Sequence, residues 1–258
     1  MQSYLWRREM NNMSDEWIVG KNPVVEALKS GRTINKIVIS DQLNNQAVHK
    51  IQALAKENGV LVNRVPRQKI DQLVEGSHQG IAAAVAAYTY SSLDDIFQVA
   101  ADKQEEPFFM LLDEIEDPHN LGSILRTADA TGVHGVIIPK RRAVGLTATV
   151  AKTSAGAIEY IPVVRVTNMA QTIEELKARH VWVVGTEAEG IEDYRALDGS
   201  LPIALVIGNE GKGISRLVKE KCDWTVRLAM KGQVSSLNAS VAGSLLMYEV
   251  YRKRNPLG

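Results

Sequence analysis

Sulfur and aromatic side chains are scarce in this sequence of 258 residues, which has a single cysteine, Cys222, and 5% aromatic residues. One cysteine excludes an internal disulfide and a thiolate cluster for zinc. The five histidines are scattered without the paired spacing of metal ligands, so we expect no metal site. Any chemistry is therefore expected from ordinary polar side chains and main-chain groups.

An excess of positive charge is absent as well. Lysine and arginine together number 30, as do aspartate and glutamate, so the formal net charge is zero. No overall positive field therefore indicates a nucleic-acid partner, although a local basic patch is compatible with this balance.

Long apolar runs are also missing. No stretch approaches the roughly 20 apolar residues of a membrane-spanning helix, and the N-terminus lacks the apolar core of a signal peptide. We therefore expect a cytoplasmic protein with no membrane partner.

Three common nucleotide-binding or catalytic patterns do not occur. The segment GNEGKGIS has Gly213 where a phosphate-binding P-loop has serine or threonine after its lysine. The turn EDPHNLGS lacks the glycines of a dinucleotide fingerprint, and no serine stands in a G-x-S-x-G elbow.

Strand and helix patterns alternate along the chain and predict an α/β protein with two domains. We expect a disordered extension over residues 1–15, a small α/β domain over 16–90, a linker over 91–106 and a second α/β domain with a mainly parallel sheet over 107–258. The polar and charged composition of the segment 91–106 and the change in composition at Pro107 favour the linker.

The first domain is expected to contain a short helix after Pro23, strands over 34–40, 60–65 and 80–88, and helices over 45–58 and 66–74. Its loop Gly20-Lys21-Asn22 holds donors among small residues. Lys21 and Asn22 could therefore meet a phosphate backbone, but solvated surface explains each of them equally well.

The second domain is expected to have strands over 107–115, 133–139, 159–166, 181–188, 203–207 and 224–228, with helices over 121–132, 147–157, 169–179 and 237–254. Asn120 stands where the first of these helices would have its N-cap. Arg126 lies off the apolar stripe of that helix and is free to face a cleft. In the last helix, the residues Leu237, Val241, Leu245 and Tyr248 form a stripe.

Two of these strands, 203–207 and 224–228, open into loops rich in glycine and small polar residues, 208–215 and 230–236. Glycine lets the backbone approach a ligand closely, and open α/β sheets bind ligands beyond the carboxyl ends of their strands. Ordinary turns between helices and strands could also be rich in glycine. The polar residues in or beside the two loops favour a pocket, and they are Asn209, Glu210, Ser235, Ser236 and Asn238. From chemistry alone, the chain is a small-molecule or nucleotide-using α/β enzyme.

Three segments add a resemblance to a known family: NLGSILRTADATGVHGVIIP (120–139), LVIGNEGKGIS (205–215) and VRLAMKGQVSSLNASVAGSLLMYE (226–249). They resemble the three ordered motifs of the SpoU (TrmH) family of RNA ribose 2′-O-methyltransferases, with Ala229 where proline is common. The first domain, with its opening GKNPVVEAL, resembles the ribosomal-protein L30e-like substrate-binding domain of one subgroup of that family.

The resemblance implies a trefoil knot in the second domain, S-adenosylmethionine as methyl donor, and a homodimer whose interface includes the terminal helix. It also implies roles for individual residues. The cofactor residues would be Gly185, Thr186, Gly208, Leu228, Met230, Ser235 and Leu237. The catalytic residues would be Asn120, Arg126, Glu210, Ser236 and Asn238. An RNA partner would also need a local patch of donors and basic side chains, and the residues themselves suggest Lys21, Asn22, Arg126, Arg141 and Lys212 for it, although dispersed surface explains any single one of them as well.

The resemblance also implies that Arg126 accepts the proton of the ribose hydroxyl, which is chemically awkward because a guanidinium group stays protonated in proteins. We expect Arg126 to hold the phosphate of the target nucleotide and to orient its hydroxyl. Glu210 could either order its loop or act in catalysis. Asn238 could be a helix cap or a member of the site.

The subgroup resembled here methylates a guanosine in the peptidyl-transferase region of 23S ribosomal RNA, which makes this RNA the expected substrate. Two alternatives stay open, namely a tRNA guanosine ribose 2′-O-methyltransferase and a non-catalytic RNA-binding protein that retains the second domain as a scaffold.

Overall fold

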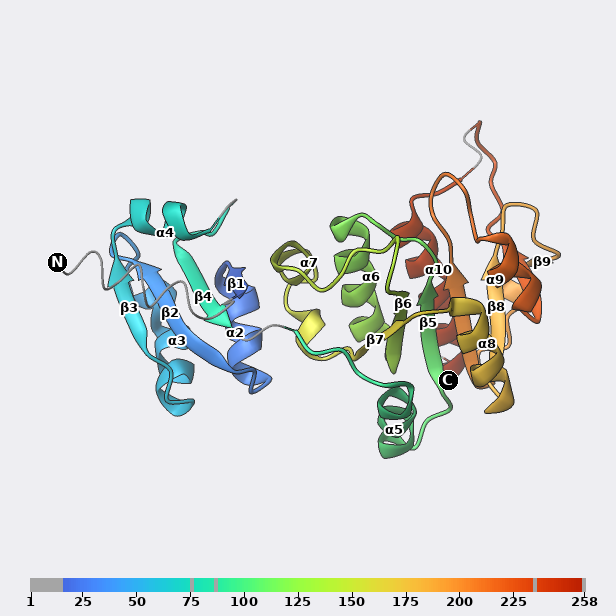
Figure 1. Ribbon diagram of the computed structural model, residues 1–258, viewed down its shortest axis with the longest axis horizontal. Coiled ribbons are helices and arrows are strands. Elements are labelled where there is room, and N and C mark those ends of the chain that lie inside the picture. Colours follow the sequence, from blue (N-terminus) through green and yellow to red (C-terminus); the bar gives the residue numbers. More distant parts are fainter. Residues whose placement is uncertain (1–15, 75–76, 86–87, 234–235, 257–258) are drawn as a thin grey trace. The chain divides into compact units, whose positions relative to one another are not determined.

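The computed structural model describes residues 16–74, 77–85, 88–233 and 236–256. The expected disordered extension over residues 1–15 lies outside these residues. The chain forms two compact units (Figure 1). The first comprises the described residues of Met1–Thr89 together with Leu146–Glu159, and the second comprises those of Tyr90–Gly145 and Tyr160–Gly258.

The first unit is built on a mixed sheet in the order β1-β4-β2-β3. Strands β2 and β3 are parallel, and the other neighbouring pairs are antiparallel. Helix α4 packs on one face through Ile70, beside Val38 and Ala82 of the sheet. The elements are β1 (Glu16–Val19), α2 (Lys21–Lys29), β2 (Ile34–Ser40), α3 (Asn45–Glu57), β3 (Val62–Val65), α4 (Arg67–Leu73) and β4 (Ile81–Val85).

A later segment returns to this unit and carries α7 (Ala148–Thr153) and the 3-10 turn η1 (Ala157–Glu159). Glu159 accepts hydrogen bonds from Arg32 Nη1 and from the Tyr88 hydroxyl, each at 3.0 Å. Burial, and then the negative charge of Glu159, raise the pKa of Tyr88. The expected helix over 147–157 is therefore wrong in length, because Ala155 and Gly156 have φ angles of 53° and 98° and end helical geometry after α7.

The expected linker over 91–106 is also corrected by the structure, because most of it is helix α5 (Leu93–Lys103). Ser92 and Asp95 form a capping box, in which each side chain bonds the backbone N–H of the other. Ile96 and Ala100, one turn apart, are buried. The acidic pair that resembled a linker is thus the first turn of a packed helix.

The second unit contains a seven-stranded sheet in the order β7-β6-β5-β10-β8-β11-β9, and every neighbouring pair is parallel. The predicted parallel sheet is confirmed. The strands are β5 (Phe108–Leu112), β6 (Gly135–Pro139), β7 (Val163–Val166), β8 (Trp182–Thr186), β9 (Glu192–Asp193), β10 (Ile203–Ile207) and β11 (Trp224–Arg227). The sequence indicated neither β9 nor the 3-10 turn η2 (Tyr194–Ala196) that follows it.

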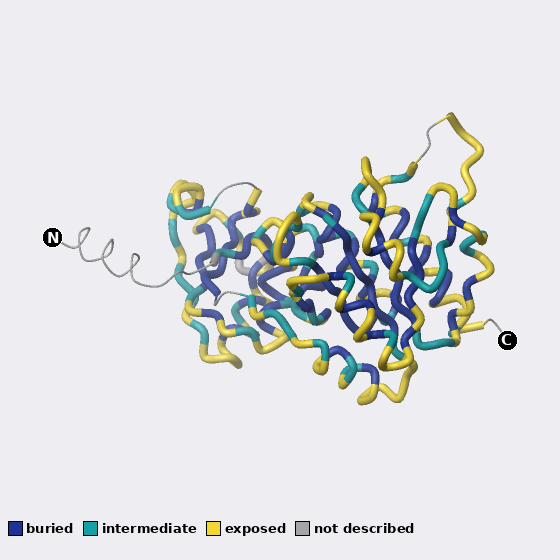
Figure 2. Tube along the Cα trace, turned by 45° about the vertical axis from the view of Figure 1, so that its right-hand side comes forward, coloured by how far each residue is buried: buried dark blue, intermediate teal, exposed yellow. Residues whose placement is uncertain are grey.

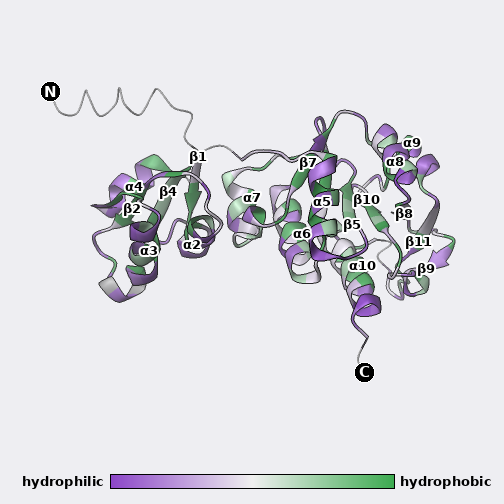
Figure 3. Cartoon of the chain, turned by 90° about the horizontal axis from the view of Figure 1, so that it is seen from below, coloured by the Kyte–Doolittle hydropathy of each residue, from purple (hydrophilic) through white to green (hydrophobic). Residues whose placement is uncertain are grey.

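Helices cover both faces of this sheet, and its central strands β5 and β10 are buried along their whole length. Figure 2 draws buried residues in dark blue and exposed ones in yellow. One face carries α5, α8 (Met169–Ala178) and α9 (Arg216–Lys221), which share a core with alternate residues of β5, β8 and β10. The other face carries α6 (Pro118–Thr131) and α10 (Ala239–Arg254). Gly243 of α10 lets this helix approach Ile207 of the sheet and Ile124 of α6. In Figure 3, α8 and α9 lie above the strands and α10 lies below them.

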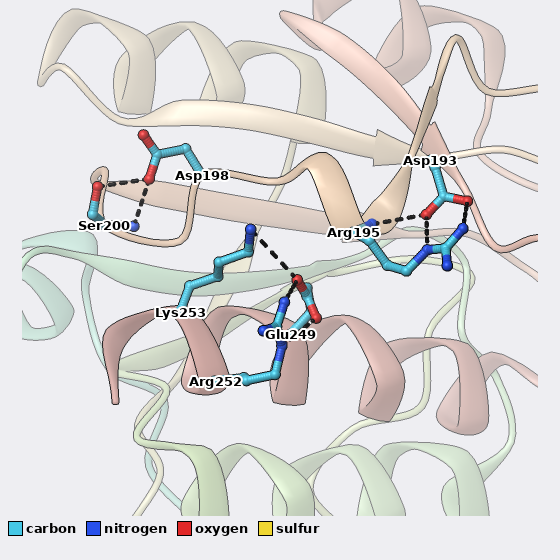
Figure 4. A network of polar contacts seen from close by, with 7 residues as sticks. All are labelled: Asp193, Arg195, Asp198, Ser200, Glu249, Arg252 and Lys253. Carbon is cyan, nitrogen blue, oxygen red and sulfur yellow. Dashed lines mark hydrogen bonds and ion pairs between the residues drawn. The ribbon is translucent and has the colours of Figure 1, made fainter. Parts of the chain in front are cut away.

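Helix α10 has two different faces. Its buried face is made of small and apolar residues such as Ala242, Gly243 and Leu246. The stripe identified in the sequence lies on the other side, where Val241, Leu245 and Tyr248 are 46%, 42% and 52% exposed. At the carboxyl end, the buried Glu249 pairs with Arg252 and Lys253, close to the Asp193–Arg195 pair (Figure 4).

No helix within the described ranges is long and apolar enough to cross a membrane.

Candidate active site

A pocket of about 340 Å³ lies at the carboxyl edge of the seven-stranded sheet. Three strand ends contribute to it: Thr186 at the end of β8, the loop from Gly208 after β10, and Leu228 after β11. These strands are neighbours in the sheet, so loops that are far apart in sequence converge at one edge. The start of α10, with Ala239, closes the pocket.

The loop after β10 is a tight hairpin held by its own backbone. Asn209 and Gly213 exchange two hydrogen bonds, N to O at 3.1 Å and 2.8 Å. A Cβ at Gly208 would lie 2.2 Å from the carbonyl carbon of Gly213, and Gly213 itself has a φ of +68°. A side chain at position 208 would therefore force the hairpin open, and one at position 213 would be strained by the left-handed backbone.

The polar centre of the site joins residues from all three sequence motifs. Oε1 of Glu210 accepts hydrogen bonds from Nδ2 of Asn120 at 2.8 Å and from Nδ2 of Asn238 at 2.5 Å. The backbone N–H of Ala239 donates to the same oxygen at 3.3 Å. Nδ2 of Asn238 also donates to Oδ1 of Asn120 at 2.9 Å. One carboxylate oxygen thus ties α6, the hairpin and α10 together.

Asn120 is not the N-cap that the sequence indicated. Helix α6 begins at Pro118, and its cap is Asp117, whose side chain accepts from the N–H of His119 at 2.8 Å. Proline at the first position of a helix sacrifices no hydrogen bond, which explains the earlier start. Asn120 is therefore inside the first turn, and its amide is available to the site.

Asn238 has both of the roles that the sequence left open. Its Oδ1 accepts from the N–H groups of Ser240 at 3.0 Å and of Val241 at 3.3 Å, which makes it the N-cap of α10. Its Nδ2 belongs to the polar centre. An asparagine amide carries an acceptor and a donor at opposite atoms, so one residue serves both.

Supporting contacts lie behind the hairpin. The buried Asp113, which follows β5, accepts from the backbone N–H of Ser215 at 2.7 Å. Nδ2 of Asn209 donates to the carbonyl of Glu114 at 3.2 Å. The loop after β5 therefore holds both ends of the hairpin.

The structure brings most of the residues predicted to bind the cofactor to this pocket. Thr186, Gly208, Leu228, Met230 and Leu237 line it. Gly185 is buried on β8 and does not line the pocket, and a Cβ at this position would lie 3.1 Å from Ile214 and 3.2 Å from Cys222. Ser235 lies outside the described residues.

Four of the five predicted catalytic residues lie at the pocket or at its polar centre, and Arg126 does not. Ser236 and Glu210 line the pocket, and Asn120 and Asn238 bond to Glu210. Arg126 is exposed on α6 and outside the lining, six residues beyond Asn120, which turns it onto another face of the helix.

The predicted RNA-binding residues are all exposed. Lys212 lines the pocket, and Arg141 lies in the loop after β6. Lys21 and Asn22 begin helix α2 of the first unit.

From the sequence, Glu187 was expected at the pocket only as part of the loop Gly185-Thr186-Glu187, with no role of its own. Further residues line the pocket without any sequence-based expectation, namely Ala188, Ile207, Ala239 and Ala242. Glu187 had a usable signal, because an acidic residue directly after a buried strand lies at the ligand-binding edge of a parallel sheet. The alanines gave none, because their role depends on how α10 packs.

Groups of three or more histidine, cysteine, aspartate or glutamate side chains with the geometry of a metal site do not occur in the described part of the chain. The single cysteine, Cys222, is half-buried beside β11, and burial raises the pKa of its thiol to about 12.

The pocket is large enough for a cofactor-sized molecule, has apolar walls and carries a few fixed polar groups, which is the usual composition of such sites. The sequence around it matches the family described as SpoU rRNA Methylase over residues 107–248. The chain belongs to this family. Residues 17–91 match a second description, RNA 2′-O ribose methyltransferase substrate binding.

Known relatives agree with this membership. The chain is 60% identical over 243 residues to YacO of Bacillus subtilis (strain 168), whose name assigns it to the TrmH family of tRNA/rRNA methyltransferases, and the match covers 94% of this chain and 98% of YacO. It is similar in structure to the SpoU methyltransferase AviRb of Streptomyces viridochromogenes in complex with the cofactor AdoMet, with 27% identity, a TM-score of 0.78 and coverage of 93% of this chain and 90% of AviRb.

A third similarity is confined to part of the chain. The TrmH/SpoU tRNA modifying enzyme of A. aeolicus is 28% identical with a TM-score of 0.53, and the match covers 58% of this chain and 76% of that enzyme.

Proposed function

We propose that this protein methylates the ribose 2′-hydroxyl of a guanosine in 23S ribosomal RNA, with S-adenosylmethionine as the methyl donor. The observation that carries the proposal is the Asn120–Glu210–Asn238 centre beside a pocket made from three strand ends. Membership of the SpoU family supports RNA ribose methylation, and the AdoMet complex of AviRb supports the cofactor.

The pocket fits this cofactor by chemistry. Apolar side chains such as Ile207, Leu228 and Leu237 suit a flat heterocycle, and the glycine hairpin lets main-chain groups approach a ligand closely. When bound, S-adenosylmethionine supplies an electrophilic methyl group on its sulfonium sulfur.

The residues of this chain position the reaction. Glu210 holds the two asparagine amides and the N-terminus of α10 in one arrangement, so the edge of the pocket is fixed before RNA binds. Such positioning of two reactants supplies much of the rate of a displacement. The exposed guanidinium of Arg126 holds a phosphate of the RNA and thereby orients the 2′-hydroxyl. The proton of that hydroxyl then passes to the phosphate or to water, because a guanidinium is a poor base.

The first unit favours ribosomal RNA over tRNA as substrate. Residues 17–91 match a substrate-binding description, whereas the similarity to the A. aeolicus tRNA modifying enzyme covers only 58% of the chain. We assign Lys21 and Asn22 to the RNA-binding surface of this unit. A tRNA guanosine substrate is the alternative, since the name of YacO includes both RNAs.

We also propose that the protein is a homodimer through the second unit. The exposed row of Val241, Leu245 and Tyr248 on α10, continued by Tyr251 at 41% exposure, is apolar surface with i, i+4, i+7 spacing, which suits packing against the same helix of a second copy.

The test is transfer of tritiated methyl from S-adenosylmethionine to unmodified 23S ribosomal RNA and, in parallel, to unmodified tRNA, with mass identification of the product nucleoside. We expect 2′-O-methylguanosine in 23S RNA. An Arg126→Ala variant should lose at least about 100-fold in rate while binding the cofactor normally, because Arg126 lies outside the pocket. Arg126→Lys should be nearly as slow, because lysine lacks the planar fork.

Methyl label in tRNA alone would contradict the proposed 23S RNA substrate and would still support ribose methylation. An Arg126→Lys variant with near-full rate would exclude the proposed orienting role. Absence of calorimetric binding of S-adenosylmethionine would leave the non-catalytic RNA-binding protein as the better explanation.

A further inference from the structure

Glu187 is a charged residue of the pocket that the mechanism above does not use. It follows β8 directly, its backbone N–H donates to the carbonyl of Val226 at 3.0 Å, and its side chain is 19% exposed. Oε2 forms an ion pair with Nζ of Lys219 on α9 at 3.2 Å. The carboxylate is therefore oriented by two fixed elements, the end of a strand and a helix.

The second carboxylate oxygen faces the hairpin. Oε1 of Glu187 lies 3.8 Å from the place that a Cβ on Gly213 would occupy. Glu187 and Gly213 both line the pocket, and because Gly213 has no side chain, no Cβ stands between this oxygen and the hairpin. It has no hydrogen-bond donor among the residues that the structure describes, so it is free to accept one from a ligand.

We propose that Glu187 recognises the ribose of the cofactor by accepting a hydrogen bond from its 2′,3′-diol. The inference rests on the proposed cofactor pocket and adds a specificity-determining residue to it.

The position and the charge environment both favour this donor. In dinucleotide-binding α/β folds, an acidic side chain beyond a strand end accepts a hydrogen bond from the ribose hydroxyls, and Glu187 stands at the corresponding edge of this sheet although the chain lacks the dinucleotide fingerprint. The amino-acid ammonium group of the cofactor is a poorer candidate, because Lys219 already places a positive charge beside Oε2 and would repel a second cation. A neutral hydroxyl pair meets no such repulsion, and a hydrogen bond to a partly sheltered carboxylate is stronger than one between neutral groups.

The experiment is calorimetry without RNA on the full chain, with S-adenosylhomocysteine, its 2′,3′-dideoxyribose analogue and 5′-deoxy-5′-methylthioadenosine, which keeps the ribose and lacks the amino acid. Glu187→Gln should weaken S-adenosylhomocysteine and methylthioadenosine by the same factor, about 10- to 100-fold. The dideoxy analogue should bind wild type weakly and should lose no more than about threefold in the variant. Glu189→Gln, an exposed residue of the same loop outside the pocket lining, is the matched control and should bind all three as wild type does.

Each other outcome decides against the inference. Equal losses for the ribose and dideoxyribose ligands would show that Glu187 only shapes the loop. Unchanged methylthioadenosine binding would assign the carboxylate to the ammonium group instead. If wild type binds none of the ligands, the proposed pocket itself fails together with this inference. If wild type binds the ligands and Glu187→Gln binds each of them with wild-type affinity, the proposed pocket is supported and only the ribose contact is wrong.

Discussion

The two edges of the seven-stranded sheet satisfy their polar groups in different ways. At the amino edge, Arg254 donates to the carbonyls of Gly199, Glu106, Pro107 and Leu201 at 2.7 to 3.3 Å, so four of its five N–H donors are used within the protein. At the carboxyl edge, Oε1 of Glu210 accepts three hydrogen bonds. Oε1 of Glu187 faces Gly213 of the hairpin that lines the pocket.

The difference indicates a division of labour. At the amino edge, the hydrogen bonds of Arg254 are made within the protein, and they hold the end of α10 against the residues that precede β5 and β10. Oriented groups with spare bonding capacity at the carboxyl edge are suited to a ligand. Substitutions at the first edge should therefore change stability, and substitutions at the second should change binding and rate.

Gly208→Ala should have the largest effect. The added Cβ would lie 2.2 Å from Gly213 and 2.3 Å from the nitrogen of Ile214, so the hairpin must open and the pocket loses a wall. We expect no detectable binding of S-adenosylmethionine by calorimetry. Gly211→Ala is the control, because a Cβ there meets only Oδ1 of Asn209 at 3.6 Å. Wild-type affinity in Gly208→Ala would mean that the hairpin is not part of the site.

Glu210→Gln should follow, with a methyl-transfer rate lower by about 100-fold and a cofactor affinity within a few-fold of wild type. A neutral oxygen holds the amides of Asn120 and Asn238 less firmly than a carboxylate does, and misplacement of reacting groups is costly. Single-turnover kinetics and calorimetry would measure the two quantities. A rate equal to wild type would reduce Glu210 to a loop residue without influence on the chemistry.

Arg254→Met should lower the free energy of unfolding by about 2 kcal/mol, because several of the four carbonyls lose their partner. Cofactor affinity should be unchanged at a temperature where the variant is folded. Arg216→Met is the control: its i,i+4 pair with Glu220 is exposed, and such pairs contribute about 0.5 kcal/mol or less. Weaker cofactor binding in folded Arg254→Met would remove the distinction between the edges.

The smallest effect is expected at His134, also on the amino edge. Its Nδ1 accepts from the N–H of Phe108 at 3.1 Å, and Nε2 lies 2.9 Å from Glu105, so the ring is neutral. Burial lowers its pKa in the folded protein. As the pH falls through about 6.5, the unfolded chain binds a proton that the folded chain resists, and stability drops.

Replacing His134 with asparagine, which keeps an acceptor near the place of Nδ1, should flatten this dependence. Thermal unfolding between pH 7.5 and 5.5 should show a smaller loss in His134→Asn than in wild type. Parallel curves for the two proteins would mean that His134 does not contribute to the acid sensitivity.

Local signals explain what could be predicted and what was missed. The glycine hairpin at Gly208 and the cap at Asn238 were visible because both depend on residues a few positions away. Helix α5 carried its own capping box, Ser92 and Asp95, but the acidic pair resembled a linker, and the burial of Ile96 depends on a distant sheet. Asn120 was placed in the wrong part of its helix because Asp117-Pro118 competes as the start. The trefoil knot stays a prediction of the family resemblance.

The sequence by itself determined most of the strands and helices, the two glycine-rich loops and the three motifs, since hydrophobic period, turn residues and caps are short-range properties of the chain. The tertiary structure decided that β10 lies between β5 and β8, and this strand order brings Asn120 to Glu210 across 90 positions and Glu187 to Lys219 across 32. Strand order follows from how whole faces pack, and no local pattern encodes it, so the polar centre and the carboxylate at the hairpin wall exist only in the folded chain.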